Sequence, residues 1–254
     1  MNYGYKNELD FVNLFNGKCF CELDDNSKNF LNELFDIKIE DNEKIVCWKN
    51  KETQKADIFI KCRNYVKGVS LKCGNSNSVH SEKIQDFKRF LLDLNIPFRI
   101  VEKYVSYHYG YFKNEMGNSD YSRRLSSEEY KNFYQDEIDC FNEYINKTKV
   151  IIDMVDRFLI RGKDFRYDID ALVSGTVDDY VWILKHNLYD LILFKRFWTN
   201  TSPHVSCMTI GPKKRGLDGD TTRIRDRYVV VVRWNNIRED IIRFHQMING
   251  SSFQ

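Results

Sequence analysis

The stretch QKADIFIKCRNYVKGVSLKCGNSNSVHSEKIQDF, residues 54–87, decides the fold. It contains two short apolar, β-branched segments, Ala56–Ile60 and Gly68–Leu71, with a polar turn at 63–65 between them. Strand-forming residues on both sides of a polar turn predict a β-hairpin. We expect this hairpin to lie in a mixed central β-sheet flanked by helices, so the predicted fold class is α/β.

Polar and charged side chains interrupt these apolar strands. Asp57 lies in the first strand, and Ser70 and Lys72 lie two apart in the second. Side chains two apart on a strand share a face, so Ser70 and Lys72 are expected to point the same way. Buried charges normally have a partner or a metal. Asp57 and Lys72 are therefore candidates for a functional pair.

A second acid follows the hairpin. After the small polar residues 73–78, the sequence predicts a helix from about His80 to Leu94 that carries Glu82 in its first turn. An acid on one strand, a lysine on the next and an acid on the following helix can hold Mg²⁺ beside an ammonium group. Such a metal stabilises phosphoryl charge and activates water, so the chemistry described is hydrolysis of a phosphodiester.

These residues resemble the PD-(D/E)XK nuclease superfamily and, within it, the type II restriction endonucleases. The family pattern is an Asp on one strand and acid-x-Lys on the next, which Asp57 and Lys72 match. Ser70 departs from the pattern, because it stands where the family usually has Asp or Glu. One branch of restriction enzymes has Ser-x-Lys there and supplies the missing carboxylate from the next helix. Glu82 looks like that migrated acid, although its spacing from Lys72 differs from the spacing in that branch.

The resemblance implies a restriction-endonuclease-like core and Mg²⁺-dependent, sequence-specific cleavage of double-stranded DNA. In this interpretation Asp57 and Glu82 bind the metal, Lys72 contacts the nucleophilic water or the scissile phosphate, and Ser70 takes a minor part. Superfamily members often carry an acid on their first helix. Glu8, on a helix predicted from Tyr5 to Phe15, is the matching candidate metal ligand, with a solvated surface glutamate as the alternative.

A second informative stretch, residues 202–234, predicts a C-terminal β-hairpin from the strand-like segments His204–Ile210 and Tyr228–Trp234. A two-stranded ribbon with an arginine-rich loop can enter a DNA major groove, and alternating arginines share one face if the second strand begins early. The alternative is a solvated basic hairpin without a partner. The predicted DNA-contacting residues are Lys213, Lys214, Arg215, Arg223, Arg225 and Arg227, together with Asn75, Asn77 and His80 after the catalytic hairpin.

Composition narrows the function classes. The 39 basic and 37 acidic residues give a net charge of +2, so a basic DNA-binding surface must be local. Seven cysteines at irregular spacings fit a reduced, cytoplasmic protein. The first ten residues lack the features of a signal peptide, and no apolar run approaches a membrane span, so we expect no membrane association.

The predicted organisation is a nuclease core at 1–105, a mainly helical insertion at 106–200, and a basic β-hairpin with a C-terminal helix at 201–254; one single domain is the alternative. The resemblance also implies a homodimer, because palindromic sites demand two active sites, and a cognate DNA methyltransferase in a restriction-modification system. Two other functions stay open. One is a repair or junction-resolving nuclease of the same superfamily, and the other is a DNA-binding module that has lost catalysis.

The sequence also predicts the structure of three further segments. The composition of Phe98–Val105 predicts a strand, and the apolar pattern of Tyr180–Phe197 predicts a helix. The tyrosine-rich segment Tyr104–Tyr121 could stack on bases, but packing in the core is the favoured interpretation.

Overall fold

The computed structural model describes residues 3–52, 55–73, 77–114, 117, 119–162, 167–197, 200–217 and 224–250. The chain forms two compact units. Unit 1 comprises Met1–Asn77, Val155–Leu191 and Asn236–Gln254, and unit 2 comprises Ser78–Met154 and Ile192–Asn235. The units are thus assembled from interleaved segments, whereas the predicted division at 105 and 200 follows the order of the chain.

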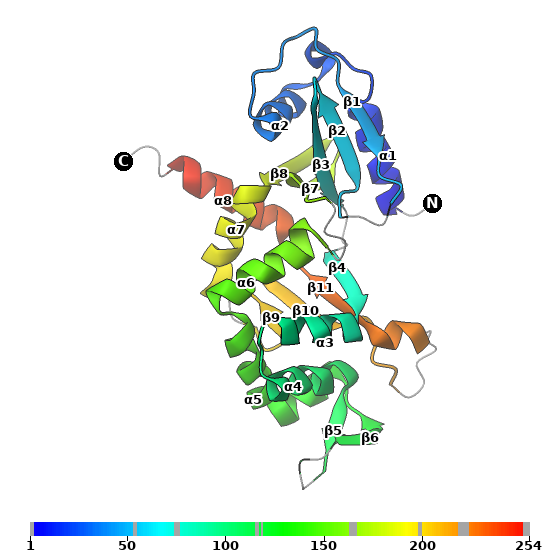
Figure 1. Ribbon diagram of the computed structural model, residues 1–254, viewed down its shortest axis with the longest axis vertical. Coiled ribbons are helices and arrows are strands. Elements are labelled where there is room, and N and C mark those ends of the chain that lie inside the picture. The colour runs from blue at the N-terminus through cyan, green and yellow to red at the C-terminus, as the bar shows by residue number, and fades with distance from the viewer. Residues whose placement is uncertain are drawn as a thin grey trace. The chain divides into compact units, whose positions relative to one another are not determined.

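Unit 1 is built on a five-stranded sheet in the order β1-β2-β3-β7-β8 (Figure 1). β3 and β7 are parallel and the other neighbours are antiparallel, so the sheet is mixed. This confirms the predicted α/β fold with a mixed central sheet, and β2 and β3 form the predicted hairpin. The strands are β1 Val46–Lys49, β2 Ile58–Cys62, β3 Tyr65–Lys72, β7 Ala171–Thr176 and β8 Asp179–Leu184.

One face of this sheet is covered by α1 (Tyr3–Phe15) and α2 (Asp25–Phe35), whose phenylalanines enter the core. α2 begins where the Asp24 carboxylate accepts a hydrogen bond of 2.8 Å from the backbone N–H of Ser27, an N-cap. The remaining elements of unit 1 are η1 Phe20–Glu22, η2 Asp156–Ile160, α8 Ile237–Gly250 and most of α7 Lys185–Phe194.

The alternation of side chains along β2 and β3 separates the core from the opposite face of the sheet. Ile58, Ile60, Val69 and Leu71 belong to the buried core beneath α1 and α2. The residues between them, including Phe59, Ser70 and Lys72, therefore belong to the other face, which we call the outer face.

Unit 2 contains an antiparallel four-stranded sheet in the order β4-β11-β10-β9. β10 and β11 pair as the predicted C-terminal hairpin. Its strands are β4 Ser78–Lys83, β9 His204–Val205, β10 Met208–Pro212 and β11 Val229–Arg233. The other elements are α3 Ile84–Asp93, α4 Phe98–Tyr109, β5 Tyr111–Lys113, β6 Ser119–Arg124, α5 Ser127–Ile145, most of α6 Thr148–Val155, η3 Lys195–Phe197 and η4 Ile224–Tyr228.

The strand predicted at Phe98–Val105 is wrong, because this segment is the start of helix α4. Ile100, Val101 and Tyr104 are buried at helical spacing, so β-branched composition did not decide the local structure. Gly110 ends the helix in the left-handed conformation with φ 67°. The preferred interpretation of the tyrosine-rich segment is confirmed for Tyr104, Tyr107 and Tyr109, which are buried.

The helix predicted at Tyr180–Phe197 begins later than expected. Asp179–Leu184 is strand β8, and α7 begins at Lys185. The residues of β8 pair with β7 along their whole length, so a tertiary contact outweighs the local apolar pattern. No helix among the residues that the structure describes combines the length and apolar character needed to span a lipid bilayer.

Candidate active site

The antiparallel pairing of β2 and β3 brings three predicted residues of unit 1 together. Ile58 pairs with Val69, which places Asp57 beside Ser70 at the end of the hairpin. Ser70 Oγ donates a hydrogen bond of 3.0 Å to Oδ2 of Asp57. Lys72 Nζ lies 4.0 Å from the same oxygen. The predicted convergence of an acid and a lysine on this hairpin is therefore present, and their catalytic roles stay a prediction.

The Asp57 carboxylate is held in one orientation. Its Oδ2 accepts a second hydrogen bond, of 2.6 Å, from the backbone N–H of Leu71. Within the described part of the chain, Oδ1 has no hydrogen-bond donor, so one oxygen is fixed and the other remains open to a ligand. The side chain is 27% exposed, which leaves the open oxygen accessible from solvent. A carboxylate held in this way is suited to bind a cation.

Glu8 on α1 lies close to this end of the hairpin. Its Oε2 is 2.6 Å from Lys49 Nζ, and Lys49 pairs across the sheet with Ile58, next to Asp57. The pKa of the Cys73 thiol is affected by charged groups at the same end of the hairpin. Burial raises the pKa of Cys73, the charge of Lys72 lowers it, and the charges of Glu8 and Asp57 raise it further. Glu8 and Asp57 thus act on one common point beside Lys72.

Glu43, by contrast, forms an ion pair with Arg63 at the β2–β3 turn, which is the opposite end of the hairpin. The Arg63 guanidinium holds the pKa of Glu43 down at about 2. This acid is therefore engaged away from Asp57. Of Glu8 and Glu43, Glu8 therefore has the better position for a second ligand.

Lys55 interacts with the charges of Asp57 and Lys72, and the sequence analysis did not identify it. Its ammonium group donates a hydrogen bond to the backbone carbonyl of Phe158 in η2. Desolvation lowers the pKa of Lys55 to about 7; the charge of Lys72 lowers it as well, and the charge of Asp57 acts in the opposite direction. A signal for it existed, because Lys55 precedes Asp57 by two residues, the spacing of one face of an extended chain.

The prediction that Glu82 lies on a helix is wrong. Glu82 belongs to β4 of unit 2, opposite Val230 of β11, and α3 begins only at Ile84. Its side chain is 1% exposed, and Oε1 lies 3.5 Å from His80 Nε2. The Tyr104 hydroxyl has a pKa well above its usual range, first through burial and also through the negative charge of Glu82. Glu82 therefore lies in the interior of unit 2, and it is not the helix-borne acid that the sequence predicted.

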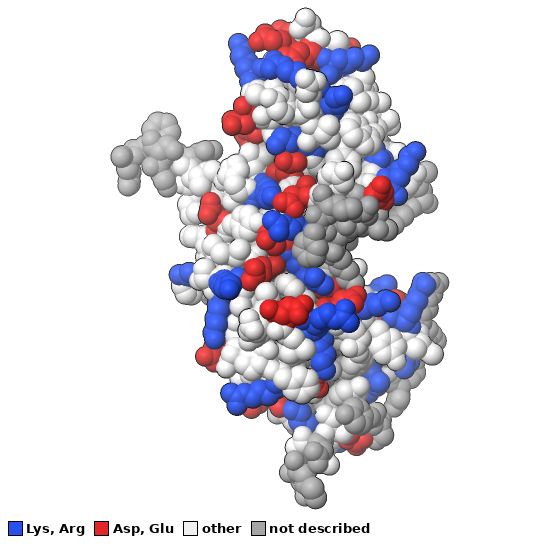
Figure 2. Space-filling view, in the orientation of Figure 1, with Lys and Arg blue, Asp and Glu red and all other residues white. Residues whose placement is uncertain are grey.

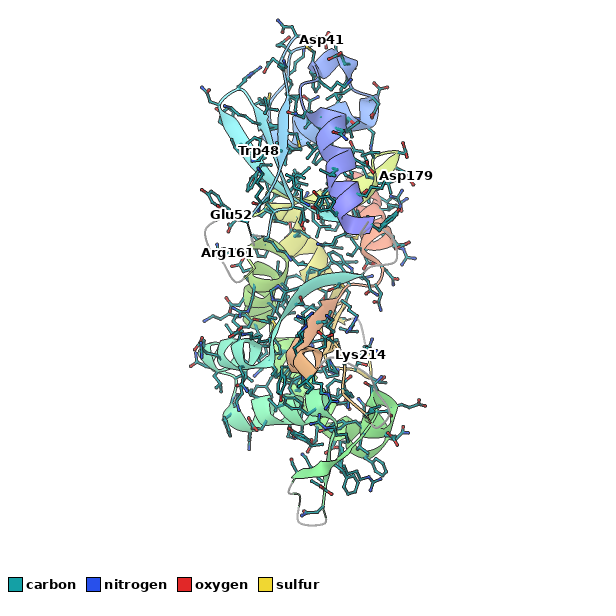
Figure 3. The ribbon with its side chains drawn as sticks, turned by 90° about the vertical axis from the view of Figure 1, so that its right-hand side faces the viewer. Asp41, Trp48, Glu52, Arg161, Asp179 and Lys214 are labelled. Atoms are coloured by element: carbon teal, nitrogen blue, oxygen red, sulfur yellow. The ribbon has the colours of Figure 1, made fainter. Side chains whose placement is uncertain are left out.

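The predicted DNA-contacting residues differ in exposure. Lys213 and Lys214 are exposed, as Figure 3 shows for Lys214, and Lys213 Nζ lies 3.1 Å from Asp226 Oδ1. Arg225 is exposed and Arg227 is half-buried in η4. The condition that the second strand begins early is not met, because β11 begins only at Val229, so Arg225 and Arg227 do not share a strand face.

Arg215 is a correction to the predicted set, because it is only 7% exposed. Its Nη1 donates to the carbonyl oxygen of Leu125 at 3.0 Å, and its guanidinium lies 4.5 Å from the ring centre of Tyr107. A buried arginine held by a carbonyl and an aromatic face supports the packing of unit 2. His80 and Asn77 are half-buried, and Asn75 and Arg223 lie outside the described residues.

The charge on the visible surface agrees with the composition. Figure 2 shows lysine and arginine side chains interspersed with aspartate and glutamate. Within the described residues, no group of three or more His, Cys, Asp or Glu side chains is placed to hold a metal ion. A cation here would therefore rely on one or two carboxylates and on water, the coordination that Mg²⁺ commonly uses.

Comparisons with known proteins support the fold. The chain is similar to the crystal structure of the restriction endonuclease MspI in complex with its cognate DNA, with a TM-score of 0.51. The match covers 82% of this chain and 76% of that chain at 8% sequence identity. No protein-family model and no curated protein matches the sequence. The similarity is therefore one of fold, and the chain has a restriction-endonuclease-like architecture.

Proposed function

We propose that this chain is a divalent-metal-dependent endonuclease that hydrolyses phosphodiester bonds in double-stranded DNA at specific sites, as a type II restriction enzyme. The observation that carries the proposal is the contact of Asp57, Ser70 and Lys72 at the end of a hairpin. This hairpin lies in a sheet whose fold resembles that of a DNA-bound restriction endonuclease. Fold alone does not define a function, so the proposal depends on the chemistry of these side chains.

The residues present fit Mg²⁺. Oδ1 of Asp57 is open, and Glu8 of α1, paired with Lys49, supplies a second carboxylate near the same end of the hairpin. We assign the second acid to Glu8 rather than to Glu82, because Glu82 is buried within unit 2 beside His80. The bound metal would neutralise charge on the phosphate and activate a water molecule.

The side chains around the carboxylate have separate roles. Lys72, with a side chain 17% exposed, presents its ammonium group to the scissile phosphate or to the attacking water and offsets negative charge that develops there. Ser70 holds Asp57 through a hydrogen bond, and Leu71 holds it through the backbone. Positioned groups of this kind lower the barrier without having to reorganise during the reaction.

Unit 2 is the proposed source of further DNA contacts. Lys213, Lys214 and Arg225 are exposed and lie on the chain that joins β10 to β11. Phosphate contacts by such residues position a duplex, and arginine can read guanine edges. Arg215 is withdrawn from this set, because its guanidinium is buried.

The wider setting follows from the same proposal. A palindromic site would require two copies of the chain, and host DNA would require protection by a cognate methyltransferase. The seven cysteines are free thiols, which suits the reducing cytoplasm where the DNA would be met.

The first experiment is cleavage of mixed plasmid and phage DNA with Mg²⁺. The wild type is compared with Lys72→Ala and with Lys61→Ala, which removes an exposed lysine from the neighbouring strand β2. Discrete bands from the wild type and from Lys61→Ala, absent with Lys72→Ala, would support a site-specific nuclease that uses this site. A smear without discrete bands, or preference for a branched substrate, would favour a repair or junction-resolving enzyme.

One observation favours a second candidate function. Ser70 occupies the position where an acid would supply another metal ligand, and it is fully buried against Asp57. A chain that has lost catalysis would bind DNA without metal and cleave nothing. Tight binding of duplex DNA in EDTA, with no cleavage under any divalent cation, would establish that function instead.

A further inference from the structure

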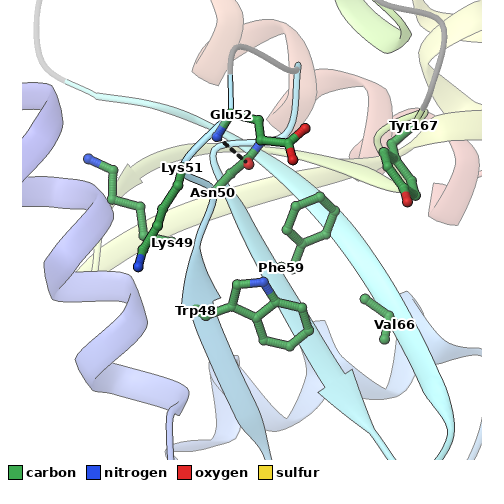
Figure 4. A pocket seen from close by; sticks show the side chains of 8 residues that line it. All are labelled: Trp48, Lys49, Asn50, Lys51, Glu52, Phe59, Val66 and Tyr167. Atoms are coloured by element: carbon green, nitrogen blue, oxygen red, sulfur yellow. Dashed lines mark hydrogen bonds between the residues drawn. The ribbon is translucent and has the colours of Figure 1, made fainter.

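A hollow of about 650 Å³ opens on the outer face of the unit 1 sheet (Figure 4). Its apolar walls are Trp48 of β1, Phe59 of β2, Val66 of β3 and Tyr167 before β7. Lys51 and Glu52, from the segment that follows β1, also line it. Figure 3 shows Trp48 and Glu52 on one side of the unit and Asp179 on the other.

The aromatic rings of the hollow form two walls. Trp48 and Phe59 stack with ring centres 5.8 Å apart and an angle of 28° between their planes. Tyr167 meets Phe59 edge-on, with centres 6.1 Å apart and an angle of 76°. A flat ligand can therefore stack on one wall while its edge meets the other.

Three side chains that line the hollow are open to solvent although they are large and apolar. Trp48 is 39% exposed, Val66 48% and Tyr167 56%. Because all three line one hollow, they form an exposed apolar patch, and such patches usually mark a binding surface. The shape and the chemistry suit a planar, aromatic partner.

The hollow lies near the candidate active site in the sequence of β2. Phe59 follows Asp57 by two residues on the outer face, a separation of about 7 Å along an extended chain. Lys51 is exposed at the rim, where a cation suits a phosphate backbone. A nucleotide joined to a phosphate at Asp57 and Lys72 would therefore have its base within reach of the hollow.

We propose that this hollow binds one unstacked nucleobase of the DNA strand whose phosphate lies at Asp57 and Lys72. The inference rests on the proposed function and adds a base-binding subsite to it. A nucleobase fits better than a second copy of the chain, because the hollow adjoins the phosphate-handling residues on one face and carries an exposed lysine. Stacking of this kind accepts any base, since every base has a π-face.

The test is a binding measurement in EDTA, which does not depend on cleavage. The probes are a single-stranded 12-mer oligonucleotide and an abasic 12-mer with the same number of phosphates. The proteins are the wild type, Trp48→Ala, Tyr167→Ala and the control Tyr65→Ala, which removes a 57% exposed tyrosine of β3 that does not line the hollow. Thermal melting of each variant checks its fold, and Tyr167→Ala tests a ring that lies outside any strand.

We expect the wild type and Tyr65→Ala to bind the base-bearing strand about five- to hundredfold more tightly than the abasic strand. Trp48→Ala and Tyr167→Ala should lose most of that preference while keeping the affinity for the abasic strand. Equal affinity of the wild type for the two strands would overturn the proposal. A folded Trp48→Ala protein that keeps the preference for bases would also overturn it. A Trp48→Ala protein with half the sedimenting mass of the wild type would overturn it too, because the hollow would then bind a second copy of the chain.

Experiments can contradict the proposed function and the proposed base-binding subsite independently of each other. Lys72→Ala removes the catalytic lysine but none of the hollow, so it should keep the preference for bases in EDTA. A wild type that discriminates bases but cleaves nothing would leave the subsite standing without the nuclease. A wild type that cleaves but does not discriminate bases would leave the nuclease standing without the subsite.

Discussion

Ser70 Oγ of β3 donates a hydrogen bond of 3.0 Å to Oδ2 of Asp57, the residue immediately before β2. Ser70 is fully buried, so this hydroxyl has no competition from bulk water. The serine that departs from the family pattern therefore has a structural role, because it orients the acid that the proposed mechanism needs.

Replacing Ser70 by alanine should weaken but not abolish activity. The backbone N–H of Leu71 still holds the Asp57 carboxylate, at 2.6 Å. We expect the free energy of unfolding to fall by about 1 kcal/mol, the usual net value of one hydrogen bond. Denaturant titration measures the stability, and DNA cleavage measures the activity. A complete loss of cleavage by a folded Ser70→Ala protein would show that the serine does more than orient Asp57.

Lys72→Ala should reduce cleavage by about a hundredfold or more, as removal of a positioned charge-stabilising group does. DNA binding in EDTA should change little, because one lysine contributes a small share of the phosphate contacts. Single-turnover cleavage and a filter-binding assay separate the two effects. Lys61→Ala, an exposed lysine on the neighbouring strand, should cleave like the wild type.

Glu8→Gln should raise the Mg²⁺ concentration needed for half-maximal cleavage by about ten- to hundredfold, a range seen even for groups that only support a metal ligand. Asp10→Asn is the matched control, because Asp10 lies on the same helix and loses the same charge. Glu82→Gln should leave the Mg²⁺ requirement unchanged, since Glu82 is enclosed in unit 2. A shift with Glu82→Gln alone would return the second acid to Glu82.

Stability should depend on pH through His108. It is fully buried, its Nε2 lies 3.0 Å from the backbone oxygen of Arg227, and desolvation lowers its pKa from 6.5 to about 4. Because the folded-state pKa is depressed, the unfolded chain binds the proton first as pH falls below 6.5. The stabilising contribution is therefore complete above pH 6.5 and is lost as pH falls through 4, by on the order of 3 kcal/mol.

Urea titrations at pH 7 and pH 4.5 measure this dependence. His108→Gln should lower stability at pH 7 but show a smaller further loss on acidification than the wild type. His186→Gln, which replaces an exposed histidine, should keep the wild-type loss. An unchanged acid sensitivity in His108→Gln would contradict the assignment.

Gly110→Ala should destabilise unit 2 more than Gly117→Ala, although both glycines have positive φ, 67° and 77°. A Cβ at Gly110 would lie 2.3 Å from the carbonyl oxygen of Leu125 and 2.7 Å from Arg215 Nη1, whereas a Cβ at Gly117 meets nothing within 4 Å. Backbone strain costs about 1–2 kcal/mol in either variant, and overpacking adds about 1–3 kcal/mol only at Gly110. Thermal melting of the two proteins compares them.

The local pattern was sufficient to predict the β2–β3 hairpin. The two-residue period of a strand places Ser70 and Lys72 on one face, and antiparallel pairing brings Asp57 to them, so both relationships follow from neighbouring sequence. The aromatic hollow was not foreseen, because Tyr167 joins Trp48 and Phe59 from more than a hundred residues away.

Glu82 and Arg215 could not be placed from sequence, because distant partners decide their positions. The segment around Glu82 becomes a strand through pairing with β11, which comes much later in the chain. Arg215 stands among basic loop residues, yet Tyr107 of α4 and Leu125 before α5 enclose it. In both cases a tertiary contact outweighs local propensity and local charge.

The parallel pairing of β3 with β7 sets the order in which the protein can form on the ribosome. Val69 pairs with Ala171, so the strand that carries Ser70 and Lys72 lacks its inner neighbour until more than a hundred further residues have been made. Pairing over such a separation closes slowly. A nascent chain that already contains the whole β2–β3 hairpin therefore still lacks β7, the strand beside β3, so the proposed cleavage of nucleic acid could not begin until synthesis is far advanced.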